Sequence, residues 1–172
     1  MPDTFSLVTP TDIVFGRGQI AQLSDRVTRL GKRVLIVHGR HPDRLARVFE
    51  SLNAVDIVQT MSVHKEPDLQ TLNAAIRQGK ALGVDLVIGI GGGSVMDSAK
   101  VLAAMLSSQT ELMSHLEVVG EGLPLSTQRL PLILIPTTSG TGAEATRNAV
   151  IDIPEAQRKV SLRDNQLLPD LA

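Results

Sequence analysis

The sequence contains no cysteine, tryptophan or tyrosine, and only three phenylalanines among its 172 residues. Without cysteine the chain has no disulfide framework, thiolate nucleophile, cysteine zinc site or iron–sulfur cluster, and it fits a reducing compartment. With so few aromatic rings, it has little to stack against bases or sugars. We therefore predict a cytoplasmic protein whose chemistry depends on neither sulfur nor aromatic platforms.

An excess of charge and long apolar runs are also missing. Seventeen Lys and Arg residues balance eighteen Asp and Glu residues, so no basic field attracts nucleic acid or an anionic membrane surface. No apolar run approaches the roughly 20 residues that span a bilayer, and the first residues lack the features of a signal peptide. We expect a soluble protein that binds neither nucleic acid nor membrane.

Four short apolar segments predict strands of a parallel sheet. Arg33–His38, Asp85–Ile90 and Pro131–Pro136 are nearly continuous and rich in β-branched residues, which is typical of strands covered on both faces. Val55–Gln59 alternates in polarity, which suits a strand nearer the edge.

Helical patterns lie between these segments. Apolar residues recur at helical spacing over 20–30, 45–52 and 69–76. We predict that Gly31 ends the first helix in the left-handed conformation and that Gly83 ends the third. Alternating strands and helices predict one α/β domain over residues 1–172, with a doubly wound, mostly parallel open sheet and helices on both faces, as in Rossmann-like folds.

Two later segments complete the predicted topology. Residues 107–129 are of mixed polarity and form a long connection with at most one short helical turn. Ala149–Ile153 and Lys159–Leu162 flank a turn and are candidate arms of a β-hairpin.

A glycine turn joins the predicted strand Asp85–Ile90 to an apolar helix that follows. Its residues are Gly91, Gly92, Gly93 and Ser94. Glycines permit positive φ angles and close approach of an anion to the backbone, and the helix N-terminus favours phosphate. The alternative is a tight turn that needs glycine for packing alone.

A second polar string, Pro136–Glu144, follows the next predicted strand and contains Thr137, Thr138 and Thr141. Loops at the carboxyl ends of parallel strands share one crevice, so these hydroxyls are candidates to face the same ligand. The alternative is a hydrophilic loop in which Thr141 or Ser139 caps the next segment.

These two strings resemble the signatures of one family. Residues 91–100 closely resemble the GGGSxxDxAK signature of the iron-containing, or group III, alcohol dehydrogenases, and residues 136–144 resemble their PTTxGTGSE signature, with Ala143 where Ser is usual. The resemblance extends from Phe15–Gly18 to Lys159–Leu162 and on to Leu168 and Pro169.

The resemblance implies an N-terminal dinucleotide-binding domain. By position, the glycine turn and Ser94 would hold the pyrophosphate, and the three threonines would lie beside the adenosine and ribose. Asp97 and Lys159 would lie near the nicotinamide. The alternatives are that Asp97, in the first turn of its helix, only complements the helix dipole and that Lys159 is a solvated turn residue; the resemblance outweighs both.

The resemblance also bears on the choice of cofactor. Some relatives carry an Asp at the end of the first parallel strand, where it binds the ribose 2′-hydroxyl and repels a 2′-phosphate. Here the matching residue is Gly39, and the neighbouring Arg40 is a candidate contact for that phosphate. We predict NAD(P) as cofactor with NADP slightly favoured; the alternative for Arg40 is an exposed loop residue.

Members of this family bind iron or zinc through an Asp and three His in a second, helical domain. The four histidines here, His38, His41, His64 and His115, show no ligand spacing. We therefore expect iron or zinc only in that domain, which we expect to be absent from these residues, and we predict that residues 1–172 alone are inactive.

The predicted function is the cofactor-binding part of a metal-dependent, NAD(P)-linked alcohol dehydrogenase, with hydride passing between nicotinamide and a small alcohol or aldehyde. Two alternatives are a free-standing nucleotide-binding module and a relative of the dehydroquinate-synthase-like lyases, which the threonine string disfavours. A homodimer is also possible, with Thr11–Phe15 as an edge strand for pairing.

Overall fold

The computed structural model describes residues 12–172, apart from the side chains of Pro42 and Arg44. In chain order the strands and α-helices are α1 (Leu23–Leu30), β1 (Arg33–His38), α2 (Ala46–Ser51), β2 (Asp56–Ser62), α3 (Leu69–Ala81), β3 (Leu86–Gly91), α4 (Gly93–Ser107), α5 (Leu112–His115), β4 (Leu132–Pro136), β5 (Asn148–Ile153) and β6 (Arg158–Arg163). Short 3₁₀ turns precede α1 and α2, and others lie at Ala143–Ala145, Pro154–Ala156 and Asn165–Leu167.

Four strands form one parallel sheet in the order β2-β1-β3-β4, which confirms the doubly wound α/β class. The predicted strands are all present, and β2 lies at an edge as its alternating polarity indicates. The strand order reverses between β1 and β3. In such sheets this reversal opens a crevice at the carboxyl ends of the strands.

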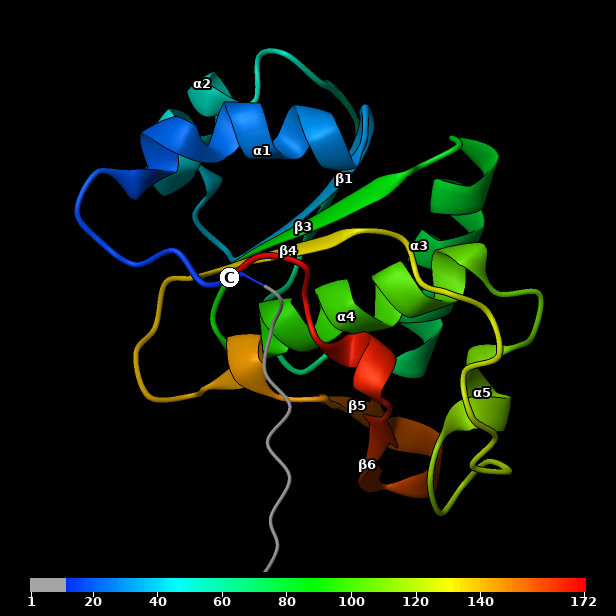
Figure 1. The fold of residues 1–172 in the computed structure, drawn as a ribbon. Helices are drawn as coiled ribbons and strands as arrows, with labels where there is room; N and C mark the ends of the chain where they lie inside the picture. Colours follow the sequence, from blue (N-terminus) through cyan, green and yellow to red (C-terminus); the bar gives the residue numbers. More distant parts are fainter. Residues whose placement is uncertain (1–11) are drawn as a thin grey trace, which may run out of the picture.

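Helices cover both faces of this sheet (Figure 1). Along β1, Val34 and Ile36 pack in the cluster that includes α1 and α2, whereas Leu35 and Val37 pack in the cluster that includes α3 and α4. Because successive side chains of a strand point to opposite faces, a run of apolar residues is required to fill both layers.

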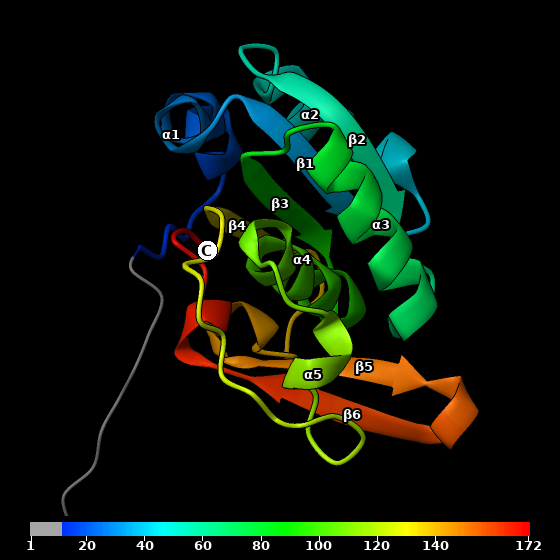
Figure 2. The same cartoon turned by 90° about the vertical axis from the view of Figure 1, so that its right-hand side faces the viewer.

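Helix α4 lies between the sheet and the hairpin formed by β5 and β6 (Figure 2). Eleven of its residues are buried, so it is apolar on most of its circumference rather than on one stripe. It approaches β3 closely at Gly89, where a Cβ would lie 2.7 Å from the Cβ of Ala99. The predicted hairpin is confirmed, and α5 is the single short helical turn expected within 107–129.

Two predictions about particular segments are wrong. Gly31 follows α1 with φ −174°, which is extended rather than left-handed. Glycine is needed there because a Cβ would lie 2.6 Å from the Cβ of Leu86, whereas Gly83 does adopt the left-handed conformation, with φ +64°.

The second error concerns Thr11–Phe15, of which Thr11 lies outside the described residues. Residues 12–15 form no strand; Asp12 makes an isolated bridge to Leu171, and the Val14 N–H donates to the Ala172 carbonyl at 2.8 Å. This backbone is therefore occupied by the chain's own last residues. In residues 12–172 no helix has the length and apolarity needed to cross a membrane.

Candidate functional site

A hollow of about 400 Å³ opens where the strand order reverses. Residues 39–41, which follow β1, line one side, and residues 92–95, at the start of α4, line the other. Val63 and His64, just after β2, complete it. The predicted residues Gly39, Arg40, Gly92, Gly93 and Ser94 are thus brought together at the crevice expected for this topology.

The N-terminus of α4 opens into this hollow without a protein cap. Gly92 is the N-cap residue, and no side chain in the described part of the chain accepts a hydrogen bond from the first turn. The first amides of a helix have no intrahelical acceptor, and the helix dipole adds partial positive charge there. This end of α4 is therefore suited to an anion that accepts several N–H bonds.

The three glycines of the turn do different things. None adopts a positive φ, so the conformational freedom predicted for them is not used. A Cβ on Gly91 would lie 2.5 Å from Val95 Cγ2, so this glycine is required for packing. Gly92 and Gly93 are less confined, with their nearest neighbours at 3.2 Å and 3.7 Å in Thr138 and Thr141, and they leave the backbone accessible.

The threonine string lies against this turn. The Thr137 N–H donates to the Gly91 carbonyl at 2.9 Å, and Thr138 and Thr141 are the neighbours of Gly92 and Gly93. All three threonines are exposed. Thr141 Oγ1 also accepts from the Ala143 N–H at 3.4 Å, so the capping alternative describes part of its role.

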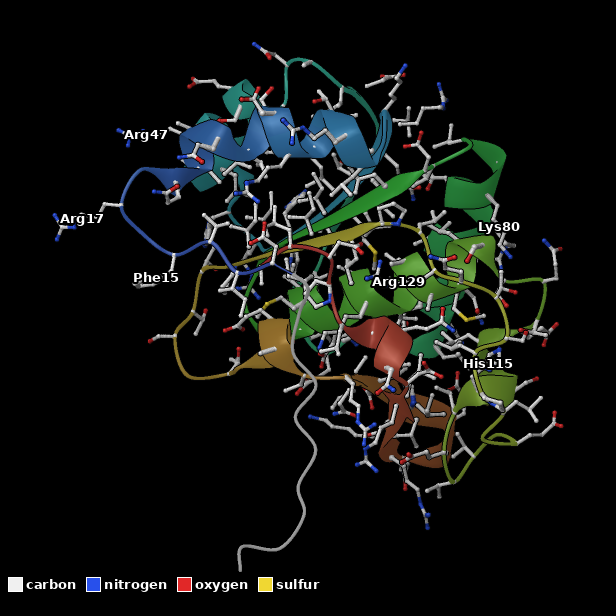
Figure 3. The ribbon with its side chains drawn as sticks, in the orientation of Figure 1. Phe15, Arg17, Arg47, Lys80, His115 and Arg129 are labelled. Carbon is white, nitrogen blue, oxygen red and sulfur yellow. The ribbon has the colours of Figure 1, made fainter. Side chains whose placement is uncertain are left out.

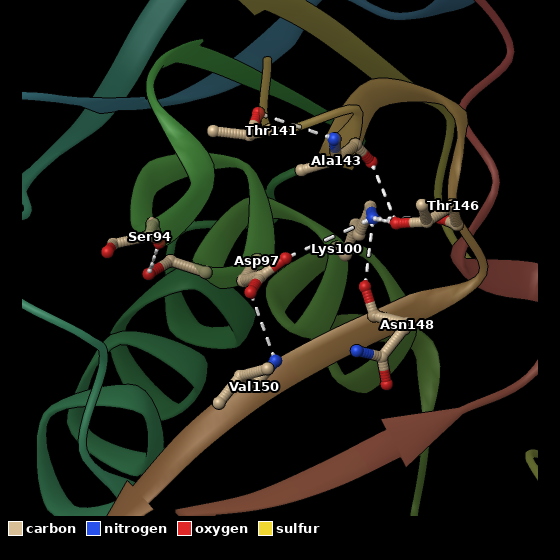
Figure 4. A network of polar contacts seen from close by, with 9 residues as sticks. Ser94, Asp97, Lys100, Thr141, Ala143, Thr146, Asn148 and Val150 are labelled. Carbon is tan, nitrogen blue, oxygen red and sulfur yellow. Dashed lines mark hydrogen bonds and ion pairs between the residues drawn. The ribbon is translucent and has the colours of Figure 1, made fainter. Parts of the chain in front are cut away.

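Asp97 lies in the second turn of α4 rather than the predicted first, and it is not one of the residues that line the hollow. Its Oδ2 accepts a hydrogen bond from the Val150 N–H at 3.1 Å, which ties α4 to β5 (Figure 4). Burial raises the pKa of this carboxyl group, and Glu66 acts in the same direction, while the Val150 N–H and Lys100 oppose the shift. Its contact with β5 distinguishes it from a carboxylate that only complements the dipole.

Lys159 is an exposed residue of β6 and is not one of the residues that line the hollow at the glycine turn. Its ammonium contacts Glu66 Oε1 at 2.8 Å, and that hydrogen bond raises the pKa of Lys159 and lowers that of Glu66. Glu66 lines a second hollow of about 220 Å³, which shares Val63 and His64 with the first. Lys159 is thus exposed, as expected for a solvated residue. Through its contact with Glu66 it also lies beside the second hollow.

Lys100 is a candidate residue that sequence reasoning did not single out. Its side chain has no solvent exposure, and its ammonium donates to the carbonyls of Thr146 and Asn148 and to Thr146 Oγ1, at 2.8, 2.9 and 3.0 Å (Figure 4). Burial lowers its pKa to about 8. The available signal was its place within the GGGSxxDxAK string, three residues after Asp97.

Three of the four histidines bond to other groups, and the fourth, His41, is exposed beside the hollow. His38 Nδ1 and His115 Nδ1 bond to the carbonyls of Gly39 and Leu123, and His64 Nε2 bonds to Ser62 Oγ. His115 is buried in α5 (Figure 3), and its Nε2 bonds to Thr110 Oγ1 at 2.6 Å. Within residues 12–172, no three acidic or histidine side chains are grouped so that they could hold a metal ion.

The family model described as "Iron-containing alcohol dehydrogenase" matches residues 10–172. The chain belongs to the iron-containing alcohol dehydrogenase family. It is 33% identical to a mitochondrial hydroxyacid-oxoacid transhydrogenase of Caenorhabditis elegans, over 98% of this chain and 38% of that protein. It is 29% identical to the NADPH-dependent aldehyde reductase YqhD of Escherichia coli, over 87% of this chain and 39% of the relative.

Solved structures of this family share the fold. The crystal structure of NADH-dependent butanol dehydrogenase A from Thermotoga maritima matches with a TM-score of 0.87 at 30% identity, over 98% of this chain and 43% of that one. The chain therefore spans less than half the length of the family members that it matches.

Proposed function

We propose that residues 1–172 form the dinucleotide-binding domain of an NAD(P)-linked alcohol dehydrogenase of this family. The observation that carries the proposal is the uncapped N-terminus of α4, which opens into the hollow at the point where the strand order reverses. Side chains on Gly92 and Gly93 would fill the space above these amides. The residues present therefore fit a pyrophosphate at this position.

In this assignment the first amides of α4 and the Ser94 hydroxyl donate to the pyrophosphate, while Thr137, Thr138 and Thr141 flank the adenosine and ribose. Asp97 and Lys159 lie toward the nicotinamide, which supplies the hydride chemistry when bound. The family membership and the dehydrogenase and reductase activities named for the relatives support a small alcohol or aldehyde as substrate.

The iron or zinc of the family does not fit residues 12–172, because their acidic and histidine side chains form no group of three that could hold it. We assign the metal to the family's second domain and derive no step through it here. A homodimer and a cytoplasmic location stay predictions, and residues 12–15 no longer support the dimer, since their backbone pairs with residues 171 and 172.

The direct test is a fluorescence titration of the protein with NADH and with NADPH, in which the reduced nicotinamide reports binding. We expect saturable binding that inorganic pyrophosphate displaces, because the pyrophosphate occupies the α4 N-terminus. Absence of binding for both cofactors would remove the assignment. Binding that pyrophosphate does not displace would place the ligand elsewhere.

We also propose a modest preference for NADPH. Gly39 places no carboxylate beside the ribose, and the exposed Arg40 lines the hollow beside it. An exposed charge contact contributes about 1 kcal/mol at most, so we expect NADPH to bind about fivefold more tightly than NADH. Arg40→Ala should remove this preference, whereas Arg47→Ala, an exposed arginine outside the hollow, should leave it unchanged. Equal affinities in the unmodified protein would contradict the assignment.

A further inference from the structure

The segment from Thr137 to Asn148 is fastened by hydrogen bonds at two places. Near its start, the Thr137 N–H bonds to the Gly91 carbonyl at the end of β3. Near its end, Thr146 and Asn148 accept three hydrogen bonds from Lys100. Between these points lie Gly140 and Gly142, both with positive φ, so the intervening backbone is irregular and contains no strand.

A chain of contacts runs from Lys100 back to the glycine turn (Figure 4). Thr146 Oγ1, which contacts Lys100, donates to the Ala143 carbonyl at 3.3 Å. The Ala143 N–H bonds to Thr141 Oγ1, and the Thr141 side chain lies over Gly93. Lys100 lies midway along α4, and these contacts link its ammonium to the threonines beside the start of the same helix.

We propose that Lys100 is a positioning residue for the dinucleotide site. Its ammonium fixes the end of the segment 137–148 against α4, and this holds Thr138 and Thr141 beside Gly92 and Gly93. The effect of Lys100 on dinucleotide binding rests on the proposed function. The hydrogen bonds from Lys100 to the segment 137–148 do not, because they are present in the chain without a ligand.

The requirement is for the ammonium rather than for an apolar stem of similar length. A lysine ammonium has three N–H donors, and here three acceptors lie within 3.0 Å of it in a fully buried position. A methionine would fill the same space and leave two backbone carbonyls without a partner. Losing partners inside a protein costs more than losing them at the surface, because water cannot replace them.

The charged groups facing the ammonium are Asp97 on α4, with Oδ1 at 4.0 Å, and Glu144 on the 3₁₀ turn. Both carboxylates raise the pKa of Lys100, but burial outweighs them and lowers it to about 8. In an open form that exposes Lys100 to water, its pKa would return toward the ordinary 10.5, so the open form binds more protons above pH 8 than the fastened form does. The fastened form should therefore not lose stability relative to the open form between pH 7 and 9.

The experiment compares Lys100→Met, Thr146→Val and the control Lys80→Met in the full chain. Lys80 also donates to a backbone carbonyl, that of Ser108, but it lies in the last turn of α3 (Figure 3) and does not line the hollow. Hydrogen–deuterium exchange of residues 137–148 is measured without ligand, and NADPH affinity is measured by fluorescence at several pH values.

We expect Lys100→Met to accelerate exchange in this segment and to weaken NADPH binding about tenfold, which is the effect of one lost charged hydrogen bond. Relative to the affinity of Lys100→Met, that of the unmodified protein should stay constant or rise from pH 7 to 9, because the open form binds the additional proton. Thr146→Val, which removes one acceptor and keeps the ammonium, should show a smaller effect of the same sign. Lys80→Met should change neither measurement.

Two results would overturn the proposal: unchanged exchange in 137–148 for both site variants, or faster exchange with unchanged NADPH affinity. If Lys100→Met does not fold, Thr146→Val decides by the same two measurements. If the unmodified protein binds no dinucleotide, the proposed function fails, while the exchange measurement still tests the fastening by Lys100.

Discussion

The adjacent glycines at the end of β3 and in the turn that follows have different structural roles. Gly91 is buried at the end of the strand and has no room for a Cβ beside Val95, whereas Gly92 and Gly93 border the hollow. Substitution at the first position should therefore act on packing, and substitution at the next two on the access of a ligand to the backbone.

Gly92→Val tests access to the helix N-terminus. Its Cβ would lie 3.2 Å from Thr138 Oγ1, and because Thr138 is exposed, it can move away at little cost. The branched side chain would then stand over the first amides of α4. We expect NADPH affinity to fall by about tenfold or more while the thermal unfolding temperature changes little, since each tenfold corresponds to about 1.4 kcal/mol.

Ala54→Val is the control, because it adds the same branched side chain at an exposed position outside the hollow. Calorimetric titration and thermal unfolding of both variants make the comparison. If Gly92→Val binds NADPH as tightly as the unmodified protein does, all three glycines are required for packing alone.

Asp97 permits a separate test of its contact with β5. Asp97→Ala leaves the Val150 N–H without its acceptor and should lower the free energy of unfolding by about 1–3 kcal/mol. Asp97→Asn keeps an acceptor oxygen and should change it by about 1 kcal/mol or less. Denaturant unfolding of the two variants measures both values, and equal losses would show that the charge, not the acceptor, matters.

The pH dependence of Asp97 has a definite sign. Burial raises its pKa above the ordinary 3.8, so near and above that pH the folded chain binds more protons at this residue than the unfolded chain does. Stability relative to Asp97→Asn should therefore fall as the pH rises through this interval. A rise over the same interval would mean that the carboxylate is stabilised in the fold.

Among the elements, α4 has the largest structural role. It contacts β3 and β4 on one side and β5 on the other, and its N-terminus forms one wall of the hollow. Close approach to the sheet is possible because β3 carries Gly89 where α4 carries Ala99, with Leu134 of β4 also close. The position of the anion-binding end of α4 thus depends on two small residues deep in the core.

Gly89→Ala tests this packing. The new Cβ would lie 2.7 Å from the Cβ of Ala99, and overpacking of this kind costs about 1–3 kcal/mol. Ala99→Gly costs about 1 kcal/mol through helix propensity, but in the double variant it relieves the clash, so the combined loss should be smaller than the sum of the two. Additive losses in denaturant unfolding would show that the two residues do not restrain each other.

At the scale of the whole molecule, our proposal places the dinucleotide hollow and the family's metal site in different domains. The described residues form the hollow, and among them no cluster of acidic and histidine side chains can bind a metal ion. The domain that we propose supplies binding and orientation for a hydride donor or acceptor, and we assign the Lewis acid that polarises a substrate oxygen to the family's second domain.

Residues 1–172 produced alone should bind NADPH without oxidising alcohols or reducing aldehydes, even with ferrous or zinc ion added. Absorbance at the reduced nicotinamide band measures turnover, and fluorescence of the same samples confirms that the cofactor is bound. Steady turnover that depends on added metal would show that this chain carries a metal site of its own.

The sheet and its helices were predictable because both signals are local. In β1, a continuous run of apolar residues indicates that both faces are covered. In β2, alternating polar and apolar residues indicate a position at the edge of the sheet. The glycine turn and the threonine string were identifiable from their composition and their place after strands. Their place at one crevice followed from the predicted parallel sheet, whereas the contacts between them and the size of the hollow required the structure.

Other features depend on contacts between distant segments. The extended Gly31 is explained by Leu86 at the start of β3 and by the preceding Asp85, and the interior position of Lys100 by Thr146 and Asn148, more than 40 residues away. A lysine within an apolar helix gives no sign in one sequence of whether it reaches solvent or buried carbonyls. Such residues are determined by packing rather than by pattern.

The last residues of the chain protect an otherwise open edge of the sheet. The Leu134 N–H bonds to the Leu171 carbonyl, the Leu132 N–H to the Asp170 carboxylate, and residues 12–14 pair with Ala172 beyond them. During synthesis, β4 therefore emerges from the ribosome with these donors unpaired until residues 170–172 follow. Over that interval the strand is a template for intermolecular pairing, so premature termination before Asp170 should yield a chain prone to aggregate.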